Sequence, residues 1–296
     1  MSEKKQPLVE NQSIDSGRIW FEHLESLIEP PHPFSAGAPF WDDPYISKNL
    51  LNSFIDAEKG VASRPPEVIL SSVEWMISRC GLDRGSCILD LGCGPGPYCQ
   101  HFAEMGMKVT GVDLSITSLR YASVVAQSSG LEIEYLEGDY LQMQIDEKFD
   151  LIIMAYGDLC TLGPDDRDLL LRKVHSWLKP DGYFVFDVVT YSRLQHLDQV
   201  NRWYTSHDSF WRSGPYLLLE HSFDYLKEGV RLEQYIVIED NGKIAAYRFW
   251  YKHYSEMELE KVLRKADLEI ENIYGDLIGS SYSEECDWMG VVTRPL

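Results

Sequence analysis

Between residues 86 and 190, short apolar runs alternate with longer amphipathic stretches. Runs of this length are typical of buried strands, and apolar positions three and four residues apart are typical of helices. Strands that alternate with helices predict right-handed crossovers and a parallel sheet covered on both faces. The expected strands are 86–91, 107–113, 131–138, 149–157 and 181–189, and the expected helices are about 97–106, 115–129 and 165–179.

After Thr190 this alternation stops and strand-like runs follow one another. Asn241-Gly242 joins two of these runs and is a strong signal for a β-hairpin. The pattern therefore predicts an antiparallel insertion before the chain returns to the main sheet. The three runs are 216–226, 230–239 and 243–253, and the returning elements are a helix at 255–266 and strands at 268–274 and 287–293.

Helical spacing also precedes the first strand of the main sheet. It predicts helices from Arg18 to Ile28, from Ser47 to Lys59, and from Pro65 to Cys80, where proline occupies a favoured first-turn position. The expected fold is a doubly wound α/β sheet of seven mostly parallel strands, with an N-terminal helical extension and an antiparallel insertion that forms a lid. The expected division is 1–64 for the extension, 65–190 with 254–296 for the core, and 191–253 for the lid.

Composition narrows the classes of function. The chain has 296 residues, with 27 Lys and Arg against 47 Asp and Glu, for a net charge of −20. This charge disfavours polyanionic partners such as DNA and RNA. No apolar run approaches the ~20 residues that span a bilayer, and the first residues lack the apolar core of a signal peptide. The sequence therefore predicts no contact with a membrane. Its six cysteines include no Cys-x-x-Cys pair and no zinc-like grouping, which predicts free thiols, no metal site and a cytoplasmic protein.

The first expected strand runs into a glycine-rich turn, Asp90-Leu91-Gly92-Cys93-Gly94-Pro95-Gly96. The dinucleotide pattern G-x-G-x-x-G fails here, because its sixth position is Pro97. Glycines at alternate positions let a ligand approach the backbone closely. Asp90 would repel a pyrophosphate but suits a cationic ligand.

The spacing Asp90-x-Gly92-x-Gly94-x-Gly96 resembles the first motif of class I S-adenosylmethionine-dependent methyltransferases. Asp113 ends the second strand seventeen residues past Gly96, where this resemblance implies a carboxylate that binds the two ribose hydroxyls. Asp139 follows the third strand, where it implies an acid near the adenine amino group. The similarity covers roughly residues 65–190 and the last two strands, and a tight strand-to-helix turn of any α/β protein is the alternative for the glycines alone.

The resemblance also implies an upstream arginine that pairs with the methionine carboxylate of the cofactor. Arg64, just before the predicted helix at Pro65, is the candidate, and an ordinary surface arginine is the alternative. The full set of expected cofactor-binding residues is Arg64, Asp90, Gly92, Cys93, Gly94, Gly96, Asp113, Leu114, Asp139, Tyr140, Ala155 and Tyr156.

A methyl sulfonium is already activated, so transfer needs mainly an acceptor held in line and water kept out. A base is needed only if the acceptor arrives protonated. The candidates lie where the fourth strand ends: Tyr156 could cover the sulfonium by a cation–π contact, and Asp158 could orient an amine or take its proton. The alternatives are core packing for Tyr156 and a helix cap or solvated turn for Asp158.

The N-terminal segment and the insertion are rich in aromatic side chains, so substrate specificity is expected there. Within the last strand of the insertion, Arg248, Trp250 and Lys252 share one face, while Tyr247, Phe249, Tyr251 and His253 share the other. One face should pack on the core and the other should roof the acceptor pocket. The expected substrate-binding residues are Trp41, Tyr45, Tyr191, Trp211, His221, Arg248 and Trp250.

Three hypotheses of function follow. The first is methyl transfer from S-adenosylmethionine to a small-molecule nucleophile, with an amine favoured, giving S-adenosylhomocysteine. The absence of the Asn/Asp-Pro-Pro-Tyr signature of base- and amide-methylating relatives supports it. The second is a tRNA or protein methyltransferase, and the third is a cofactor-binding regulator without transfer activity. No feature of the sequence indicates an oligomeric state.

Overall fold

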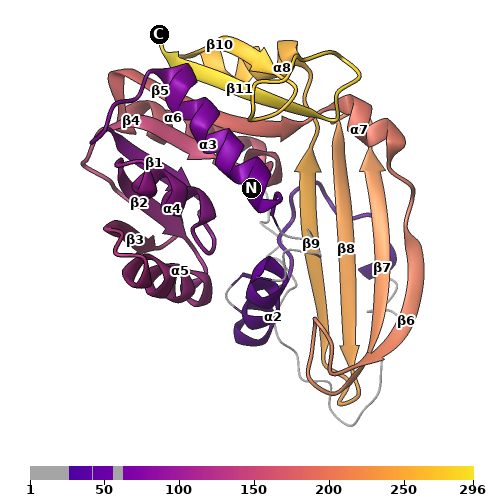
Figure 1. The fold of residues 1–296 in the computed structure, drawn as a ribbon. Helices are drawn as coiled ribbons and strands as arrows, with labels where there is room; N and C mark the ends of the chain where they lie inside the picture. Colours follow the sequence, from indigo (N-terminus) through magenta and orange to yellow (C-terminus); the bar gives the residue numbers. More distant parts are fainter. Residues whose placement is uncertain (1–26, 42, 56–62) are drawn as a thin grey trace, which may run out of the picture.

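The computed structural model describes residues 27–41, 43–55 and 63–296, which form two sheets with helices around the larger one (Figure 1). The larger sheet has the order β10-β11-β5-β4-β1-β2-β3, and β11 runs antiparallel to both of its neighbours. The expected α/β class with a seven-stranded, mostly parallel sheet is therefore confirmed. Its strands are β1 Cys87–Leu91, β2 Lys108–Asp113, β3 Ile133–Glu137, β4 Phe149–Met154, β5 Leu178–Val189, β10 Leu268–Tyr274 and β11 Trp288–Pro295.

The helices begin at residues that suit a helix start. Proline occupies the first turn of α3, α4 and α6. The side chain of Ser115 caps α5, and Ser255 and Glu258 form a capping box on α8. The bounds are α2 Pro44–Ile55, α3 Pro66–Cys80, α4 Pro97–Glu104, α5 Ile116–Ser128, the 3₁₀ helix η2 Asp158–Thr161, α6 Pro164–Trp177, α7 Tyr191–His196 and α8 Glu256–Arg264.

The junction between α6 and β5 differs from the predicted one. The helix ends at Trp177 and the strand begins at Leu178, instead of a helix to 179 and a strand from 181. Leu178 pairs with Phe149, but the next pair is Tyr183 with Leu151, so the intervening residues are displaced from the regular register. The break that was predicted at Pro180, between helix and strand, is thus an irregularity inside β5.

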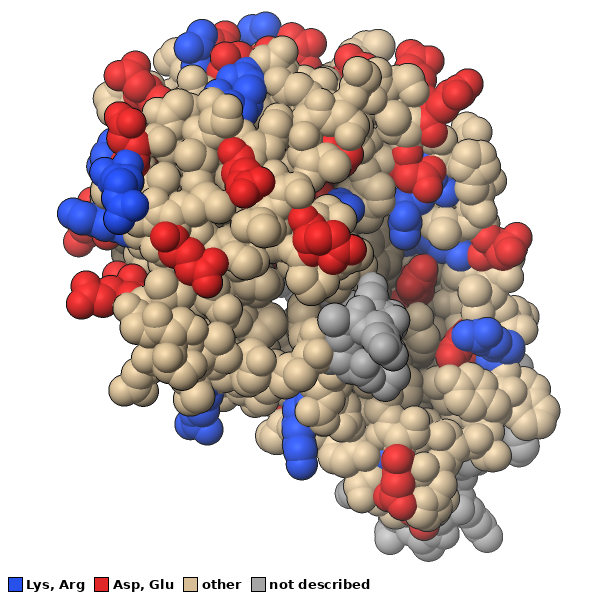
Figure 2. Space-filling view, viewed as in Figure 1, with Lys and Arg blue, Asp and Glu red and all other residues tan. Residues whose placement is uncertain are grey.

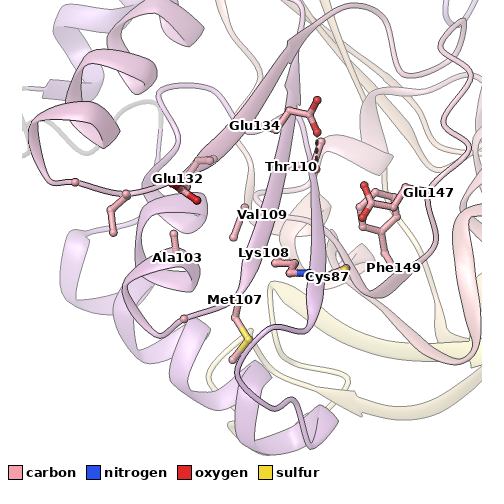
Figure 3. Close-up of a pocket in the computed structure, with 14 residues that line it drawn as sticks. Cys87, Ala103, Met107, Lys108, Val109, Thr110, Glu132, Glu134, Glu147 and Phe149 are labelled. Atoms are coloured by element: carbon pink, nitrogen blue, oxygen red, sulfur yellow. Dashed lines mark hydrogen bonds between the residues drawn. The ribbon is translucent and has the colours of Figure 1, made fainter.

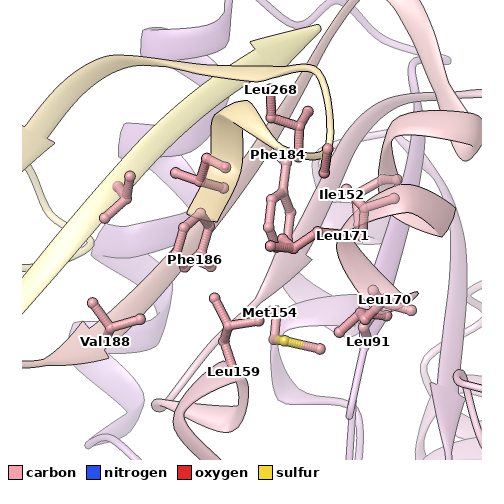
Figure 4. Close-up of a cluster of buried hydrophobic side chains, with 14 of the residues drawn as sticks. Leu91, Ile152, Met154, Leu159, Leu170, Leu171, Phe184, Phe186, Val188 and Leu268 are labelled. Atoms are coloured by element: carbon pink, nitrogen blue, oxygen red, sulfur yellow. The ribbon is translucent and has the colours of Figure 1, made fainter. Parts of the chain in front are cut away.

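Apolar side chains fill both sides of the larger sheet. Figure 4 shows Leu91, Ile152, Met154, Phe184 and Phe186 of the central strands against residues of α6, η2 and β10. Neighbouring residues of the same strands, among them Ile88, Ile153 and Val185, are buried on the opposite side with α3 and α4. Burial of successive residues explains why these strands are continuous apolar runs in the sequence.

The insertion is a four-stranded antiparallel sheet with the order β6-β7-β8-β9. Three of these strands match predicted runs, but β6 was not expected from the sequence. Its residues are nearly all exposed on an edge, so it lacks the alternation of apolar and polar positions that marks a half-buried strand. The bounds are β6 Asn201–His207, β7 Pro215–Tyr225, β8 Val230–Glu239 and β9 Ile244–Lys252.

Residues 31–41, here called the N-terminal strap, cross the edge of β9. The backbone N–H of Ala38 donates to the carbonyl of Ala246, and the indole N–H of Trp250 donates to the carbonyl of Ser35. Beyond this crossing, Phe40 packs edge-on against Phe249 on the other face of the sheet. The strap therefore covers an edge strand and leads into α2, which lies between the two sheets in Figure 1. The helix predicted at Arg18–Ile28 falls almost entirely outside the described residues.

All six cysteines are free thiols. Among the helices of the described residues, none has the length and apolar character needed to span a membrane.

Gly290 in β11 provides a test of the packing between the β10–β11 connection and the sheet. A Cβ atom at this position would lie 1.9 Å from the carbonyl oxygen of Asp276, which is backbone and cannot rotate away. We expect Gly290→Ala to lower the free energy of unfolding by about 3 kcal/mol or more. Gly130→Ala is the control: its φ of +67° is strained, but its Cβ would have open space, so about 1–2 kcal/mol is expected. Urea unfolding followed by circular dichroism measures both, and equal losses would contradict the steric argument.

Candidate active site

Three carboxylates meet at one edge of the larger sheet. Strand β1 pairs in parallel with both β2 and β4, so the carboxyl ends of the three strands coincide. Asp113 is the last residue of β2, Asp90 lies in β1, and Asp158 begins η2 after β4. A Cβ atom on Gly92 would lie 2.9 Å from Oδ2 of Asp158, so this carboxylate reaches the glycine loop. This is the edge at which parallel α/β sheets bind ligands.

The glycine loop takes a conformation that its sequence permits. Gly92, Gly94 and Gly96 have φ values of +74°, +54° and +78°, in the left-handed region. Asp113 anchors the loop, because Oδ2 accepts from the N–H of Gly94 at 2.8 Å and Oδ1 accepts from the N–H of Ser115 at 2.7 Å. Each oxygen retains a lone pair, so Asp113 can also accept from two further hydroxyls.

Burial raises the pKa values of two of these carboxylates toward neutral pH. Burial raises the pKa of Asp90, 2% exposed, to about 7; the Cys99 thiol, which donates at 3.2 Å, opposes this, and the other two carboxylates add to it. Burial also raises the pKa of half-buried Asp158 to about 6, against a hydrogen bond donated by Tyr140 at 3.1 Å. Across residues 27–41, 43–55 and 63–296, no lysine or arginine forms an ion pair with Asp90, Asp113 or Asp158. The cluster therefore fits a cationic ligand.

The remaining expected cofactor residues are placed around this edge, and their roles stay predictions. Cys93 is buried against Gly111, so only its backbone faces the loop. Leu114 is 48% exposed. Asp139 accepts from the N–H of Leu141 at 2.8 Å and thereby closes the turn that presents Tyr140 to Asp158.

Tyr156 lies at the mouth of the site in a strained conformation. Its φ is +70°, uncommon for a residue other than glycine, and its side chain is 41% exposed. The ring stacks on Trp288 with 5.9 Å between centroids. The N–H of the next residue, Gly157, donates to Oδ1 of Asp187 at 2.8 Å, which holds the turn in place. Packing thus fixes an exposed aromatic ring where the fourth strand ends.

Arg64 is brought to the same place. Its guanidinium forms a 2.5 Å ion pair with fully buried Asp187, and its Cζ lies 5.6 Å from the ring centroid of Tyr156 and 4.7 Å from that of Trp288. Burial would lower the pKa of Arg64, but the Asp187 carboxylate outweighs it, and the net shift is upward. Arg64 is therefore not a plain surface arginine, and a role toward the cofactor carboxylate stays a prediction.

Asp187 and Trp288 lie at the candidate site but were not predicted from the sequence. For Asp187 a signal existed, since it is an acid inside the apolar run 184–189, where a buried charge requires a partner. For Trp288 there was none, because only the pairing of β11 with β5 brings it beside Tyr156.

Three of the expected substrate-binding residues share one face of the insertion. His221, Gln234 and Arg248 are paired across β7, β8 and β9 and therefore share one face, on which Trp250 also lies. The strap occupies this face: Arg248 donates to Ser35 and Ala36, and Trp250 donates to Ser35. Arg248 and Trp250 therefore contact the strap, and a role of His221, Arg248 or Trp250 toward a substrate stays a prediction.

The other expected substrate residues are dispersed. Trp211 is 8% exposed in an apolar cluster with Tyr247 and Ile46 of α2. Trp41, 47% exposed, packs edge-on against Phe40. The hydroxyl of Tyr45 donates to the carbonyl of Ser209, and that of Tyr191 donates to Glu258. The structure does not bring these four side chains together beside Tyr156.

Two cavities have different relations to the site. The larger, of about 650 Å³, lies at the amino ends of the strands and is lined by acidic residues, Lys108 and Phe149 (Figure 3). Because parallel sheets bind ligands at the carboxyl ends, it is unsuited to the cofactor. The smaller, of about 250 Å³, adjoins the glycine loop and is lined by Phe54 of α2, Arg64 and Pro95.

Comparison with known proteins agrees with this geometry. Residues 88–182 match the model of the methyltransferase domain family. A protein of Geobacillus sp. (strain WCH70) named as a methyltransferase is 28% identical over 173 residues, 57% of this chain and 69% of that relative. The malonyl-[acyl-carrier protein] O-methyltransferase of Pseudescherichia vulneris is 30% identical over 129 residues, 43% of this chain and 49% of that relative, so the chain spans about half its length.

Among solved structures, an S-adenosylmethionine-dependent methyltransferase from Clostridium acetobutylicum ATCC 824 superposes with a TM-score of 0.65 at 20% identity, covering 83% of this chain and 98% of that chain. This likeness concerns the fold. Sheet order, glycine loop and carboxylates together define a class I S-adenosylmethionine-dependent methyltransferase. Together with the match over residues 88–182, these features indicate a methyltransferase that uses S-adenosylmethionine.

The raised carboxylate pKa values predict a pH dependence of cofactor affinity. Below pH 6 both Asp158 and Asp90 are largely protonated, and a cationic cofactor binds best when they are ionised. We expect the affinity for S-adenosylmethionine to rise between about pH 5.5 and 7.5. Calorimetric titrations across this range test it, with Asp158→Asn expected to remove the step near pH 6. An affinity that is independent of pH in the wild-type protein would contradict the electrostatic argument.

Proposed function

We propose that this protein transfers the methyl group of S-adenosylmethionine to a small-molecule nucleophile, with an amine favoured, by direct in-line displacement. The observation that carries the proposal is the cluster of Asp90, Asp113 and Asp158, which has no cationic partner among the described residues and borders a loop of left-handed glycines. S-adenosylmethionine brings the missing positive charge, and it supplies an activated methyl group when bound. S-adenosylhomocysteine is the expected product.

The residues have distinct roles in this proposal. Asp113 would accept from the two ribose hydroxyls with the lone pairs that its backbone contacts leave free. Asp90 and Asp158 would supply negative charge behind the glycine loop. Tyr156, held rigidly on Trp288, would cover the sulfonium side of the pocket by a cation–π contact. Asp139 would lie toward the adenine.

Two features favour a small acceptor. Helix α2 and the insertion sheet stand beside the larger sheet in Figure 1, and Phe54 of α2 lines the smaller cavity next to the glycine loop, so these additions would leave less room for a macromolecule there. Acidic side chains are spread over the face seen in Figure 2, and the basic ones form no continuous stripe on it. A polyanion such as tRNA requires such a stripe.

The preference for an amine rests on Asp158. A half-buried carboxyl with a pKa of about 6 titrates close to neutral pH and can take a proton from an ammonium acceptor before transfer. The Pseudescherichia relative is named for an oxygen acceptor on a carrier-bound malonyl group, so an oxygen nucleophile is the competing assignment.

Cofactor binding tests the site. We expect Asp113→Ala to weaken binding of S-adenosylmethionine at least about 100-fold, because two hydrogen bonds to a charged acceptor are lost at about 1.5 kcal/mol or more each. Asp146→Ala, which removes an exposed carboxylate just before the amino end of β4, should bind as the wild type does. Calorimetry measures all three proteins. No binding by the wild type would refute the proposed function.

The acceptor class is tested by methyl transfer from radiolabelled S-adenosylmethionine to three fractions of a cell extract: small molecules, RNA and protein. We expect label in the small-molecule fraction, in products that remain basic amines. Label only in RNA or protein would replace the proposal with a macromolecular acceptor. Binding without label in any fraction would favour a regulator.

A further inference from the structure

Arg193, in the first turn of α7, is half-buried and differs from the other arginines that are not exposed. Six of those donate to an oxygen acceptor of the protein, and the guanidinium of Arg193 has no such acceptor among the described residues. None of its guanidinium nitrogens is buried without a partner, so they remain accessible and can donate to a ligand that enters the site. The six are Arg64, Arg79, Arg167, Arg212, Arg231 and Arg248.

The helix that carries Arg193 is fixed to the main sheet. The hydroxyl of Thr190 accepts from the N–H of Arg193 and donates to the carbonyl of Cys286, and the hydroxyl of Ser192 donates to the carbonyl of Glu285. The N–H of Thr190 also donates to the carbonyl of Asp287. Because these bonds join α7 to the start of β11, the position of Arg193 relative to Trp288 is set by the fold.

The guanidinium packs on Trp288, which with Tyr156 forms the stacked aromatic pair of the candidate site, here called the aromatic wall. Its Cζ is 5.3 Å from the ring centroid of Trp288, the ring on which Tyr156 stacks. Tyr251 of β9 responds to the charges of both residues: burial chiefly raises its pKa, Glu233, Tyr235 and Tyr156 raise it further, and Arg193 lowers it. Tyr251 belongs to the face of the insertion opposite Arg248 and Trp250, where Phe40 of the strap packs against Phe249. Arg193 therefore lies between the core and the Tyr251 side of the insertion.

We propose that Arg193 binds an anionic oxygen group, a carboxylate or a phosphate, on the methyl acceptor. The guanidinium fork matches both groups in two-point hydrogen bonding. With the proposed amine nucleophile at Tyr156 and Asp158, the acceptor class is an amine that carries an anionic group on the same molecule. This inference rests on the proposed function for the transfer step, but the anion site itself does not depend on it.

The competing role for Arg193 is structural, as a cation packed on Trp288. An arginine with only a structural role would affect stability, and its loss would not change the preference for ligands that carry a carboxylate or phosphate. The two roles therefore separate in a binding measurement with matched probes. Suitable pairs are glycine with glycinamide, which differ in the carboxylate, and O-phosphoethanolamine with ethanolamine, which differ in the phosphate.

Calorimetric titration of the four probes into the protein, with and without saturating S-adenosylhomocysteine, is the test. In at least one pair, we expect the member that carries the carboxylate or phosphate to bind about tenfold or more tightly than the member that lacks it. The pair that shows the preference identifies the group. Arg193→Met should reduce the preference to about one and Arg193→Lys should restore part of it, chiefly for phosphate, because lysine offers a point charge in place of a fork. Arg294→Met, which removes an equal charge from the exposed far end of β11, should keep the wild-type preference.

The outcomes separate the inference from the proposed function. Equal affinities within both pairs, no binding of any probe, or a preference that survives Arg193→Met would overturn the anion site. Failure to bind S-adenosylhomocysteine would refute the proposed function while the cofactor-free titrations still decide the role of Arg193. Unchanged melting temperature and cofactor affinity in Arg193→Met are the controls for folding.

Discussion

Burial of three neighbouring carboxylates, without a counter-charge among the described residues, is the constraint on which the candidate site depends. Parallel pairing of β1 with β2 and β4 forces their carboxyl ends to one edge, and each of these three segments brings an aspartate there. In isolation such a cluster is unfavourable, and the protein responds by keeping Asp90 and Asp158 partly protonated near neutral pH. A cation that enters releases this electrostatic cost, so part of the binding energy for the cofactor is already present in the fold.

The glycine loop and the aromatic wall both border the carboxyl ends of the central strands. Ligand approach from outside the strand ends requires a backbone without Cβ atoms, and hydrogen bonds to Asp113 hold that backbone in its left-handed conformation. On the other side, Asp187 holds both Arg64 and the turn after Tyr156. One buried carboxylate of β5 thus fixes the strained residue that borders the acceptor side.

Much of this could be predicted from the sequence, because it depends on local patterns. Successive apolar residues predicted the central strands. The spacing of Asp90, the glycines and Asp113 predicted a cofactor site at the carboxyl ends of these strands. What the sequence does not contain is the choice between the two faces of β9. Alternation separates Arg248 and Trp250 from Phe249 and Tyr251, but it is symmetric, and only the path of the strap decides which face is covered. Strand β6 was missed because an exposed edge strand has no apolar face to mark it.

Charges of opposite sign lie on the two sides of the candidate site, negative near the glycine loop and positive toward the insertion. Carboxylates lie behind the glycine loop, while the half-buried guanidinium of Arg193 lies beyond the ring of Trp288, on the side of the insertion. In a protein of net charge −20, Arg193 forms no ion pair with a carboxylate of the described residues, so its guanidinium stays available to a ligand. The strap engages Arg248, and Tyr251 lies on the opposite face of β9, on the side of Arg193. With Arg193 as the proposed anion site, the two ends of the site differ in sign, and a small acceptor with a nucleophile at one end and an anion at the other would be held in only one direction.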